Sequence, residues 1–442
     1  MKQLPATLTE LQQAIASGQV SAQQAWQMQL ARRDALDARW HCMSRPFDIA
    51  QAQASASGPL AGIALAHKDN FDTWGHRPGC GVDSGHADAE VEPAWAIEQL
   101  GRAGAGHLGA LVMAPYACGA TSANPRFERC INPLHPEAVV GGSSSGSAVA
   151  VAGGLAYGSL GTDTAGSVRI PAATCGLVGL KTTHGLIPTG GLFPLAPSLD
   201  GIGILARTAA DARQLLRPLA PALSEPARPQ RPRVRAWLPS DWLHPQVAKP
   251  LSALAQRLQA EPVSLQEEHT RLSHLADIVL HTEVAHLQRP ALLDGSLSAA
   301  VLPLALPGLV MPPAWYDAAL ATRSAQLRRF CLTTLATDGV LMLPALPQPV
   351  PDWQSVHVGH SRFVPRELLA LHRCMGFINY LGLPSVVLPI GSDERGLPVS
   401  VQLVARPFQE HMLLALAEQM QLEAGHAGCA FAPGQLLPAT EN

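Results

Sequence analysis

Lysine is scarce in this sequence of 442 residues. Of its 31 basic residues only four are lysines, at positions 2, 68, 181 and 249, and the rest are arginines. Arginine stays protonated in proteins, whereas a buried lysine can lose its proton. A lysine kept in an apolar stretch, such as Lys68 in LAHKDN, is therefore predicted to be needed as a lysine.

Charge and long apolar runs are also in short supply. Only 15% of residues are charged and the net charge is −3, with no basic run, so nucleic acid and an anionic membrane are not expected as partners. The longest apolar stretch, 148–160, is broken by glycines and too short to cross a bilayer. The start, MKQLPATLTELQQ, lacks the apolar core of a secretory signal. These features predict a compact, soluble, cytoplasmic protein.

Paired cysteines and metal-ligand motifs are missing too. The eight cysteines, at 42, 80, 118, 130, 175, 331, 374 and 429, form no C-x-x-C pair, and a chain of this length does not need disulfides as staples. They are interpreted as reduced thiols. No H-E-x-x-H motif and no Cys/His pair has the spacing of zinc ligands, so neither a metal nor a cofactor is expected.

The sequence does contain two clusters of glycine and serine between Gly141 and Pro171. Ser143 lies in the first cluster and Ser167 in the second, with Lys68 upstream as the available base. Small residues at Ala165 and Gly166 would let backbone N–H groups approach a carbonyl oxygen, and a short helix is predicted directly after them. Serines held in this way predict a hydrolase whose nucleophile is a serine.

Other interpretations of the glycines remain open. The glycines of either cluster could serve only tight turns beside a packed helix. Residues 142–146 fit G-x-S-x-G, which would make Ser144 the nucleophile and require a downstream acid and histidine. Residues 104–109 fit G-x-G-x-x-G, but their predicted order is helix, glycines, strand, the reverse of a dinucleotide site.

The pattern of apolar residues alternates helices with buried strands, which favours an α/β fold with a mostly parallel sheet. A surface linker is predicted over 221–235 and a helix-rich region over 236–330. Helices are expected within 7–36 (two, the second capped by Ser21) and over 93–103, 145–157, 207–220, 365–380 and 409–423, and strands over 59–67, 107–113, 139–140, 339–346, 385–390 and 398–404.

The chain resembles the amidase signature family. The motifs GGSSSGSAVAVAGG, SLDGIG, GTDTAGSVRIPAA and LAGIALAHKDNFD carry this resemblance, together with the later segments DGVLMLPALPQP and GLPVSVQLVARPFQEHMLL. The resemblance implies one large domain over 1–442, with a twisted, mixed but mostly parallel sheet flanked by helices on both faces. Residues 213–330 would be a divergent helical middle region within it.

The resemblance also implies roles for individual residues. Ser167 would be the nucleophile, Ser143 a bridging serine that follows a cis peptide bond, and Lys68 the base. Backbone N–H groups of Thr164, Ala165, Gly166 and Ser167 would form the oxyanion hole. The supporting residues around the triad would be Ser144, Asp163, Arg169 and Asp200.

The sequence departs from the family pattern in three places. The family often has two glycines before the nucleophile, and here Ala165 replaces the first of them. The resulting Ala-Gly pair resembles the allophanate-hydrolase and indoleacetamide-hydrolase branches. Thr182 stands where proline is usual. In GALVMAPYACG (109–119), apolar residues replace the Lys-Thr-Asn that normally precedes Met113, and Pro115 replaces a glutamate. That segment borders the expected active site, so it affects the identity of the substrate more than the chemistry.

The predicted function is hydrolysis of a small-molecule carboxylic amide to an acid plus ammonia or an amine, through an acyl-enzyme on Ser167. A homodimer is expected from the family alone. The alternative is a glutaminase-type subunit that supplies ammonia within an amidotransferase complex. A non-catalytic binding protein is a third hypothesis, against which the joint presence of Lys68, Ser143 and Ser167 argues.

Overall fold

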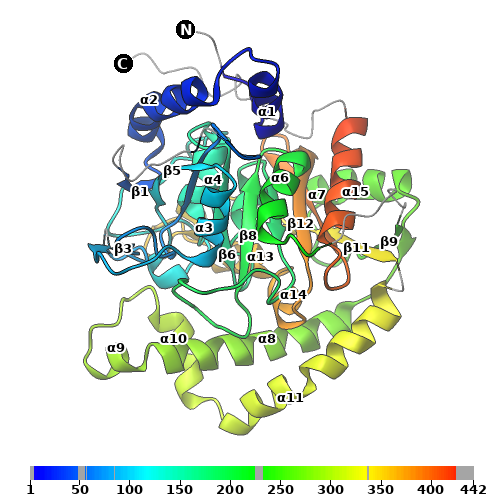
Figure 1. Ribbon diagram of the computed structural model, residues 1–442. Coiled ribbons are helices and arrows are strands. Elements are labelled where there is room, and N and C mark those ends of the chain that lie inside the picture. The colour runs from blue at the N-terminus through cyan, green and yellow to red at the C-terminus, as the bar shows by residue number, and fades with distance from the viewer. Residues whose placement is uncertain are drawn as a thin grey trace.

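A mixed sheet of 11 strands is the centre of the computed structural model, which describes residues 4–47, 55, 57–83, 85–223, 232–335 and 338–424 (Figure 1). The strands lie side by side in the order β1-β5-β2-β6-β8-β7-β12-β13-β11-β9-β10. Their bounds are β1 Met43–Pro46, β2 Ala64–Lys68, β5 Gly106–Leu111, β6 Gly158–Asp163, β7 Val178–Lys181, β8 Gly201–Ala206, β9 Arg233–Ala236, β10 Glu261–Pro262, β11 Gly339–Pro344, β12 Ser385–Ser392 and β13 Pro398–Val404. A separate hairpin pairs β3 (His76–Arg77) with β4 (His86–Ala87).

Helices surround this sheet. Those before the middle region are α1 Leu8–Ala16, α2 Ala22–Trp40, α3 Trp95–Arg102, α4 Ser145–Ala152, α5 Arg169–Thr174 and α6 Ala209–Leu219. The middle region contains α7 Pro245–Arg257, α8 Gln266–Leu287, α9 Arg289–Leu293, α10 Leu302–Val310 and α11 Pro313–Phe330. The last group is α12 Trp353–Val356, α13 Pro365–His372, α14 Gly376–Tyr380 and α15 Glu410–Glu423.

The α/β class and the mixed sheet are confirmed, but the expectation of a mostly parallel sheet is wrong. Six of the ten neighbouring pairs are antiparallel, and four are parallel. The reason lies in the connections. Only five residues separate β12 from β13, too few for the crossover that a parallel pair requires. The composition of a buried apolar strand does not depend on whether its neighbour is parallel or antiparallel, so the sequence did not indicate the directions of the strands.

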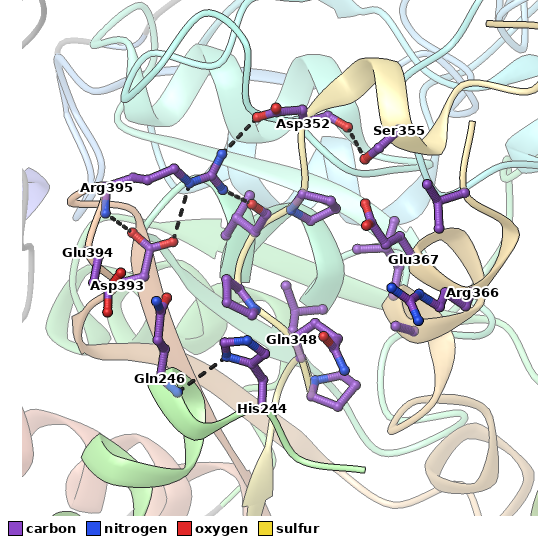
Figure 2. Close-up of a pocket in the computed structure, with 18 of the residues that line it drawn as sticks. His244, Gln246, Gln348, Asp352, Ser355, Arg366, Glu367, Asp393, Glu394 and Arg395 are labelled. Carbon is purple, nitrogen blue, oxygen red and sulfur yellow. Dashed lines mark hydrogen bonds and ion pairs between the residues drawn. The ribbon is translucent and has the colours of Figure 1, made fainter. Parts of the chain in front are cut away.

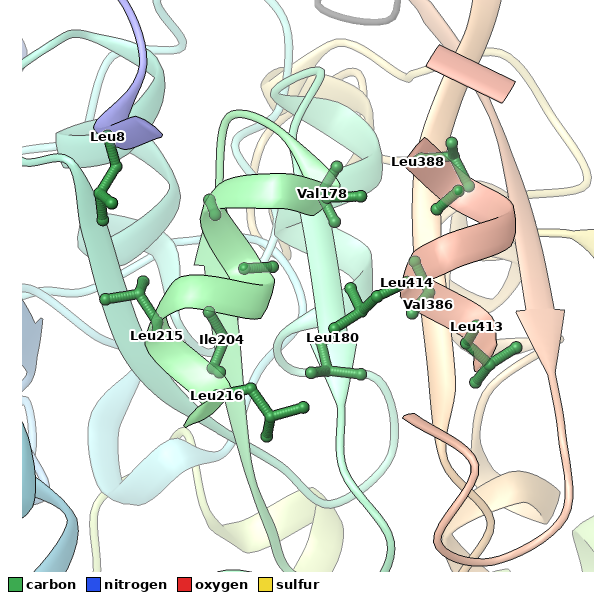
Figure 3. Packing of buried hydrophobic residues seen from close by; sticks show 14 of the residues in the cluster. Leu8, Val178, Leu180, Ile204, Leu215, Leu216, Val386, Leu388, Leu413 and Leu414 are labelled. Atoms are coloured by element: carbon green, nitrogen blue, oxygen red, sulfur yellow. The ribbon is translucent and has the colours of Figure 1, made fainter. Parts of the chain in front are cut away.

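Successive side chains of the buried strands point to opposite faces of the sheet, and helices cover both faces. In β2, Ala64 and Ala66 contact one apolar cluster together with Val149 of α4. Leu65 between them belongs to a different cluster, which includes Leu215 and Leu216 of α6. Figure 3 shows α6 and α15 packed over β8, β7 and β12 in that second cluster. The sheet is therefore buried on both sides, and its strand ends hold polar residues in a dry interior.

Helices α8, α10 and α11 of the middle region form a layer along one end of the molecule, below the sheet in Figure 1. Helix α7 is separate from this layer and packs into the apolar cluster of the sheet through Val247, Leu251 and Leu254. An apolar cluster joins this layer to the core, since Leu272 and Val279 of α8 share it with Leu195 and Leu199. Residues 195–199 directly precede Asp200, one of the predicted site residues. The middle region therefore borders the loop that leads to the candidate site.

Most of the other predicted elements are present, with three differences. Ser21 caps α2 as expected, within a capping box formed with Gln24. Residues 139–140 are not a strand, because only an isolated bridge joins Ala138 to Asp352. The helix expected over 365–380 is two helices, α13 and α14. The predicted linker over 221–235 runs into β9 at its end, and 224–231 lies outside the described residues.

In the described ranges, none of the helices combines the length and the apolar character needed to span a bilayer.

The buried leucines of α15 allow a direct test of this packing. Leu414→Ala should lower the free energy of unfolding by about 2–5 kcal/mol, because its side chain is fully buried and truncation leaves a cavity. Leu422 on the same helix is 62% exposed, so Leu422→Ala should stay within about 0.5 kcal/mol of the unsubstituted protein. Urea denaturation followed by circular dichroism measures both. Equal effects of the two substitutions would contradict the packing described here.

Candidate active site

Lys68 is the last residue of β2 and lies in the interior of the protein, with 1% of its surface exposed. Its Nζ forms hydrogen bonds with Ser143 Oγ at 2.8 Å and with Thr162 Oγ1 at 2.7 Å. Thr162, on the adjacent strand β6, also accepts a hydrogen bond from Asn70 Nδ2 at 3.1 Å. The buried strand therefore delivers a lysine amine directly to the predicted bridging serine.

The surroundings of Lys68 lower the pKa of its amine. Burial lowers its pKa to about 7, although the nearby carboxylates of Asp200 and Asp163 act in the opposite direction. An amine with this pKa is largely unprotonated just above neutral pH and can then accept a proton. The electrostatic condition for a lysine base is therefore met at this position.

Ser143 and Ser144 lie in a tight loop just before α4. The peptide bond between Gly142 and Ser143 is cis, as the resemblance implied. Glycine is required here because a Cβ at Gly142 would come within 2.7 Å of a backbone oxygen, and a Cβ at Gly161 within 2.6 Å of Ser144 Oγ. Ser144 N donates to the carbonyl oxygen of Ser167 at 3.2 Å, which brings the two serine clusters together. Ser144 Oγ donates to Thr162 O at 3.4 Å, close to Lys68 as expected.

Ser167 lies two residues before α5 and is 7% exposed. Across the described residues its hydroxyl makes no hydrogen bond. Of the expected chain from Lys68 through Ser143 to Ser167, the first link is thus formed and the second is not formed in this structure. Catalytic hydrogen bonds are often long without substrate and tighten in the complex.

The loop 164–167 is held in place by Asp163. Its Oδ1 accepts a hydrogen bond from Gly166 N at 2.9 Å and its Oδ2 one from Val168 N at 3.1 Å. The Gly166 N–H, one of the four expected oxyanion-hole donors, is therefore already engaged. The other three, from Thr164, Ala165 and Ser167, have no hydrogen-bond acceptor within the described part of the chain, so they are the donors that could bind a ligand.

Asp163 and Arg169 form a buried ion pair, and neither side chain is exposed. Arg169 donates to the carboxylate through Nε at 3.0 Å and through a terminal nitrogen at 2.8 Å. Asn379 on α14 adds a hydrogen bond at 3.0 Å. Burial opposes the charge of Asp163, but Arg169 and Asn379 outweigh it and hold the pKa of the carboxyl well below its usual range. Asp163 therefore supports the loop as a carboxylate.

Asp200, the residue directly before β8, supports the same loop. Its Oδ1 accepts a hydrogen bond from the hydroxyl of Thr164 at 2.5 Å, and its Oδ2 accepts from Leu195 N at 2.9 Å and Ala196 N at 3.2 Å. Burial raises the pKa of this carboxyl to about 6, while these hydrogen bonds and Lys68 counteract the rise. Asp200 thus ties the loop before β8 to the loop that carries Ser167.

Sequence reasoning missed several residues that complete this arrangement. His372 of α13 contacts the carbonyl oxygen of Ala165 through Nδ1 at 3.1 Å, so that this nitrogen must donate. With Asp163 holding the N–H of Gly166, both ends of the Ala165–Gly166 peptide are fixed. Thr162 and Asn70 lie close to predicted residues, two positions from Thr164 and Lys68, and this spacing was a usable signal. His372, one of 17 histidines, gave none.

One pocket of the structure lies away from these residues. It has a volume of about 700 Å³ and lies between α13, the start of α7 and the β12–β13 turn, and none of the predicted site residues lines it (Figure 2). Arg395 on its wall is paired with Asp352 at 2.7 Å and with Asp393 at 3.7 Å. No cluster of three or more His, Cys, Asp or Glu side chains suited to a metal ion occurs within the described ranges.

Comparisons with known proteins place this arrangement in a family. A family model described as Amidase matches residues 30–251 and 310–414. The chain is 31% identical to a glutamyl-tRNA(Gln) amidotransferase subunit of Synechococcus sp. (strain WH7803), over 97% of this chain and 100% of that protein. It is 30% identical to the protein of the same name from Moorella thermoacetica (strain ATCC 39073 / JCM 9320), over 93% of this chain and 95% of that protein.

Solved structures agree with this assignment. A structure described as "Crystal structure of amidase" is 29% identical and aligns with a TM-score of 0.81 over 94% of this chain and 99% of that chain. Another, described as a vestigial protein complex that reveals the evolutionary origins of an s-triazine catabolic enzyme, is 26% identical, with a TM-score of 0.84 over 95% of this chain and 98% of that chain. The chain belongs to the amidase signature family.

Proposed function

We propose that this protein hydrolyses a small carboxylic amide to an acid and ammonia or an amine, with Ser167 as nucleophile. The observation that carries the proposal is the 2.8 Å contact between Lys68 Nζ and Ser143 Oγ, made by an amine whose pKa is lowered to about 7. Membership of the amidase signature family supports the same class of reaction.

In this proposal, Ser167 Oγ attacks the amide carbon while its proton passes to Ser143 Oγ, and the proton of Ser143 passes to the neutral amine of Lys68. The carbonyl oxygen becomes an oxyanion, which accepts hydrogen bonds from the free N–H groups of Thr164, Ala165 and Ser167. The C–N bond then breaks as the proton returns through Ser143 to the leaving nitrogen. Water cleaves the acyl-enzyme by the same transfers and restores Ser167.

A second candidate is the ammonia-supplying component of an amidotransferase. The observation in its favour is the name shared by the relatives at 30–31% identity, that of an amidotransferase subunit, which supports this alternative more directly than it supports a free-standing amidase. Both candidates use the same cleavage of an amide C–N bond. They differ in the substrate, which would be glutamine for such a component, and in whether the isolated chain is active.

Substitution of the nucleophile tests the chemistry. Ser167→Ala should lower kcat/KM for an amide substrate by at least about 10³-fold, because in this proposal the acyl-enzyme forms on Ser167 Oγ. The assay is ammonia release from a panel of glutamine, acetamide and benzamide, with isolated wild-type protein. Ser355→Ala, outside the candidate site, is the control and should keep wild-type activity. A Ser167→Ala protein as active as wild type would refute the mechanism. Hydrolysis of glutamine alone, dependent on a partner protein, would favour the second candidate.

The state of Lys68 predicts a pH dependence. Only the unprotonated amine can accept a proton, so kcat/KM should rise about tenfold per pH unit below pH 7 and level off above it. Lys68→Arg should abolish activity at every pH up to 9, because a guanidinium keeps its proton. Lys249→Arg, at an exposed position, should leave the profile unchanged. A flat profile from pH 5 to 9, or an active Lys68→Arg protein, would exclude Lys68 as the base.

A further inference from the structure

Two segments without charged residues, 103–125 and 185–199, are hydrogen-bonded to residues at or next to the Lys68–Ser143 pair. Ala114 N donates to the carbonyl oxygen of Ser143 at 3.2 Å, which ties segment 109–119, the one that departs from the family pattern, to the bridging serine. Phe193 N donates to the carbonyl oxygen of Asn70 at 2.9 Å, and the side chain of Asn70 reaches Thr162, the second partner of Lys68. Both segments therefore border the reacting groups.

The first segment has an unusual backbone. Tyr116 and Ala117 are consecutive residues with positive φ angles, 49° and 62°, in the left-handed region that residues with side chains seldom adopt. Such conformations are unfavourable and persist where the surrounding structure imposes them. Here Tyr116 N donates to Cys80 O at 2.7 Å and Ala117 N to Ala114 O at 2.9 Å. The backbone is thus held in a form that sets the direction of the Tyr116 ring.

That ring meets an aromatic side chain of the other segment. The ring centroids of Tyr116 and Phe193 are 5.7 Å apart, with an angle of 38° between the planes. Tyr116 is half-buried and Phe193 is 37% exposed, so the pair retains surface that a further group could cover. Aromatic rings contribute favourable contacts to such a group beyond the area that they bury.

The two segments that carry this pair are uncharged, and the charged group outside them that acts on Tyr116 is Asp83, a carboxylate that, after burial and Cys80, helps to raise the pKa of the phenol. Neither 103–125 nor 185–199 contains a charged residue. An apolar cluster joins Met113, Cys118 and Leu195, and Tyr116 and Ala165 pack against it. Behind it, Arg323 donates to Ser198 O at 2.6 Å and Glu283 accepts from Ser198 N at 3.0 Å, so both charges are engaged by the main chain. A free amino acid carries an ammonium and a carboxylate, which are costly to bury without partners.

We propose that Tyr116 and Phe193 form an aromatic gate that selects amides of uncharged, aromatic acids and disfavours glutamine. The aromatic acyl group would pack against the two rings while its carbonyl carbon lies at Ser167. This inference rests on the proposed amide hydrolysis and adds the class of substrate to it.

The test compares kcat/KM for benzamide, acetamide and glutamine in wild type and ring variants. Wild type should prefer benzamide to both other amides by at least about tenfold. Tyr116→Leu and Phe193→Leu should each lower kcat/KM for benzamide by about 3- to 10-fold, mainly through KM, because each removes one ring contact. Hydrolysis of acetamide should stay within about twofold of wild type, which shows that the active site is intact. Tyr116→Phe, which keeps the ring that Tyr116→Leu removes, should retain the wild-type preference for benzamide.

Trp74→Leu is the matched control, because Trp74 is 38% exposed, close to the value for Phe193, and its ring packs on His107 instead. It should leave the ratio of benzamide to acetamide unchanged. If wild type hydrolyses amides but prefers glutamine, or if the ring variants keep the wild-type ratio, the gate is refuted and the proposed hydrolysis stands. If wild type releases ammonia from none of the three amides, the proposed hydrolysis and the gate both fall.

Discussion

The contact between the amine of Lys68 and the hydroxyl of Ser143 is the interaction on which the rest of the site depends. It requires a lysine that is buried enough to lose its proton near neutral pH, and that condition is set by the dry interior around β2. The carboxylates of Asp163 and Asp200 lie near enough to raise the pKa of Lys68. Each is occupied by other partners, Asp163 by Arg169 and Asp200 by Thr164. Burial therefore remains the dominant influence on the amine.

Asp163 has a second role, as the centre of a network that shapes the loop around Ser167. Its carboxylate contacts Arg169 from its own segment and Asn379 from α14. Arg169 in turn donates to Gln402 on β13 at 2.7 Å. Elements from the two halves of the chain thus converge on the Asp163–Arg169 ion pair. A charge buried so completely is tolerated because nearly every polar atom around it has a partner.

The site residues that could be predicted from the sequence are those that lie within short local motifs. Lys68, Ser143, Ser167, Asp163 and Arg169 lie within two segments. The side chains of Lys68 and Ser143 meet, as do those of Asp163 and Arg169, whereas the hydroxyls of Ser143 and Ser167 are not hydrogen-bonded to each other. The roles of these residues in catalysis stay predictions. Asn379, Gln402 and His372 reach the same loop from more than 200 residues away, and no local pattern identifies them.

The fold shows the same division. Buried strands and amphipathic helices were recognisable because their periodicity is local, as in β2, β11 and α15. The directions of the strands were not, since they depend on how β6, β7 and β8 are connected in space. The claim of one domain over the whole chain also stays a prediction, although a single sheet includes both β1 and β13.

The crowding at Gly142 and Gly161 has a consequence for how this site can vary. At both positions one added carbon would collide with an atom less than 3 Å away, in the first case a backbone oxygen that cannot rotate aside. The close approach of Ser143 to Lys68 therefore depends on two positions that have no side chain. The backbone oxygen that crowds Gly142 belongs to Gly119, so the main chain at the end of segment 109–119 is fixed against the loop that carries Ser143. A change of side chain within that segment is compatible with this contact, whereas a change in the path of its backbone is not.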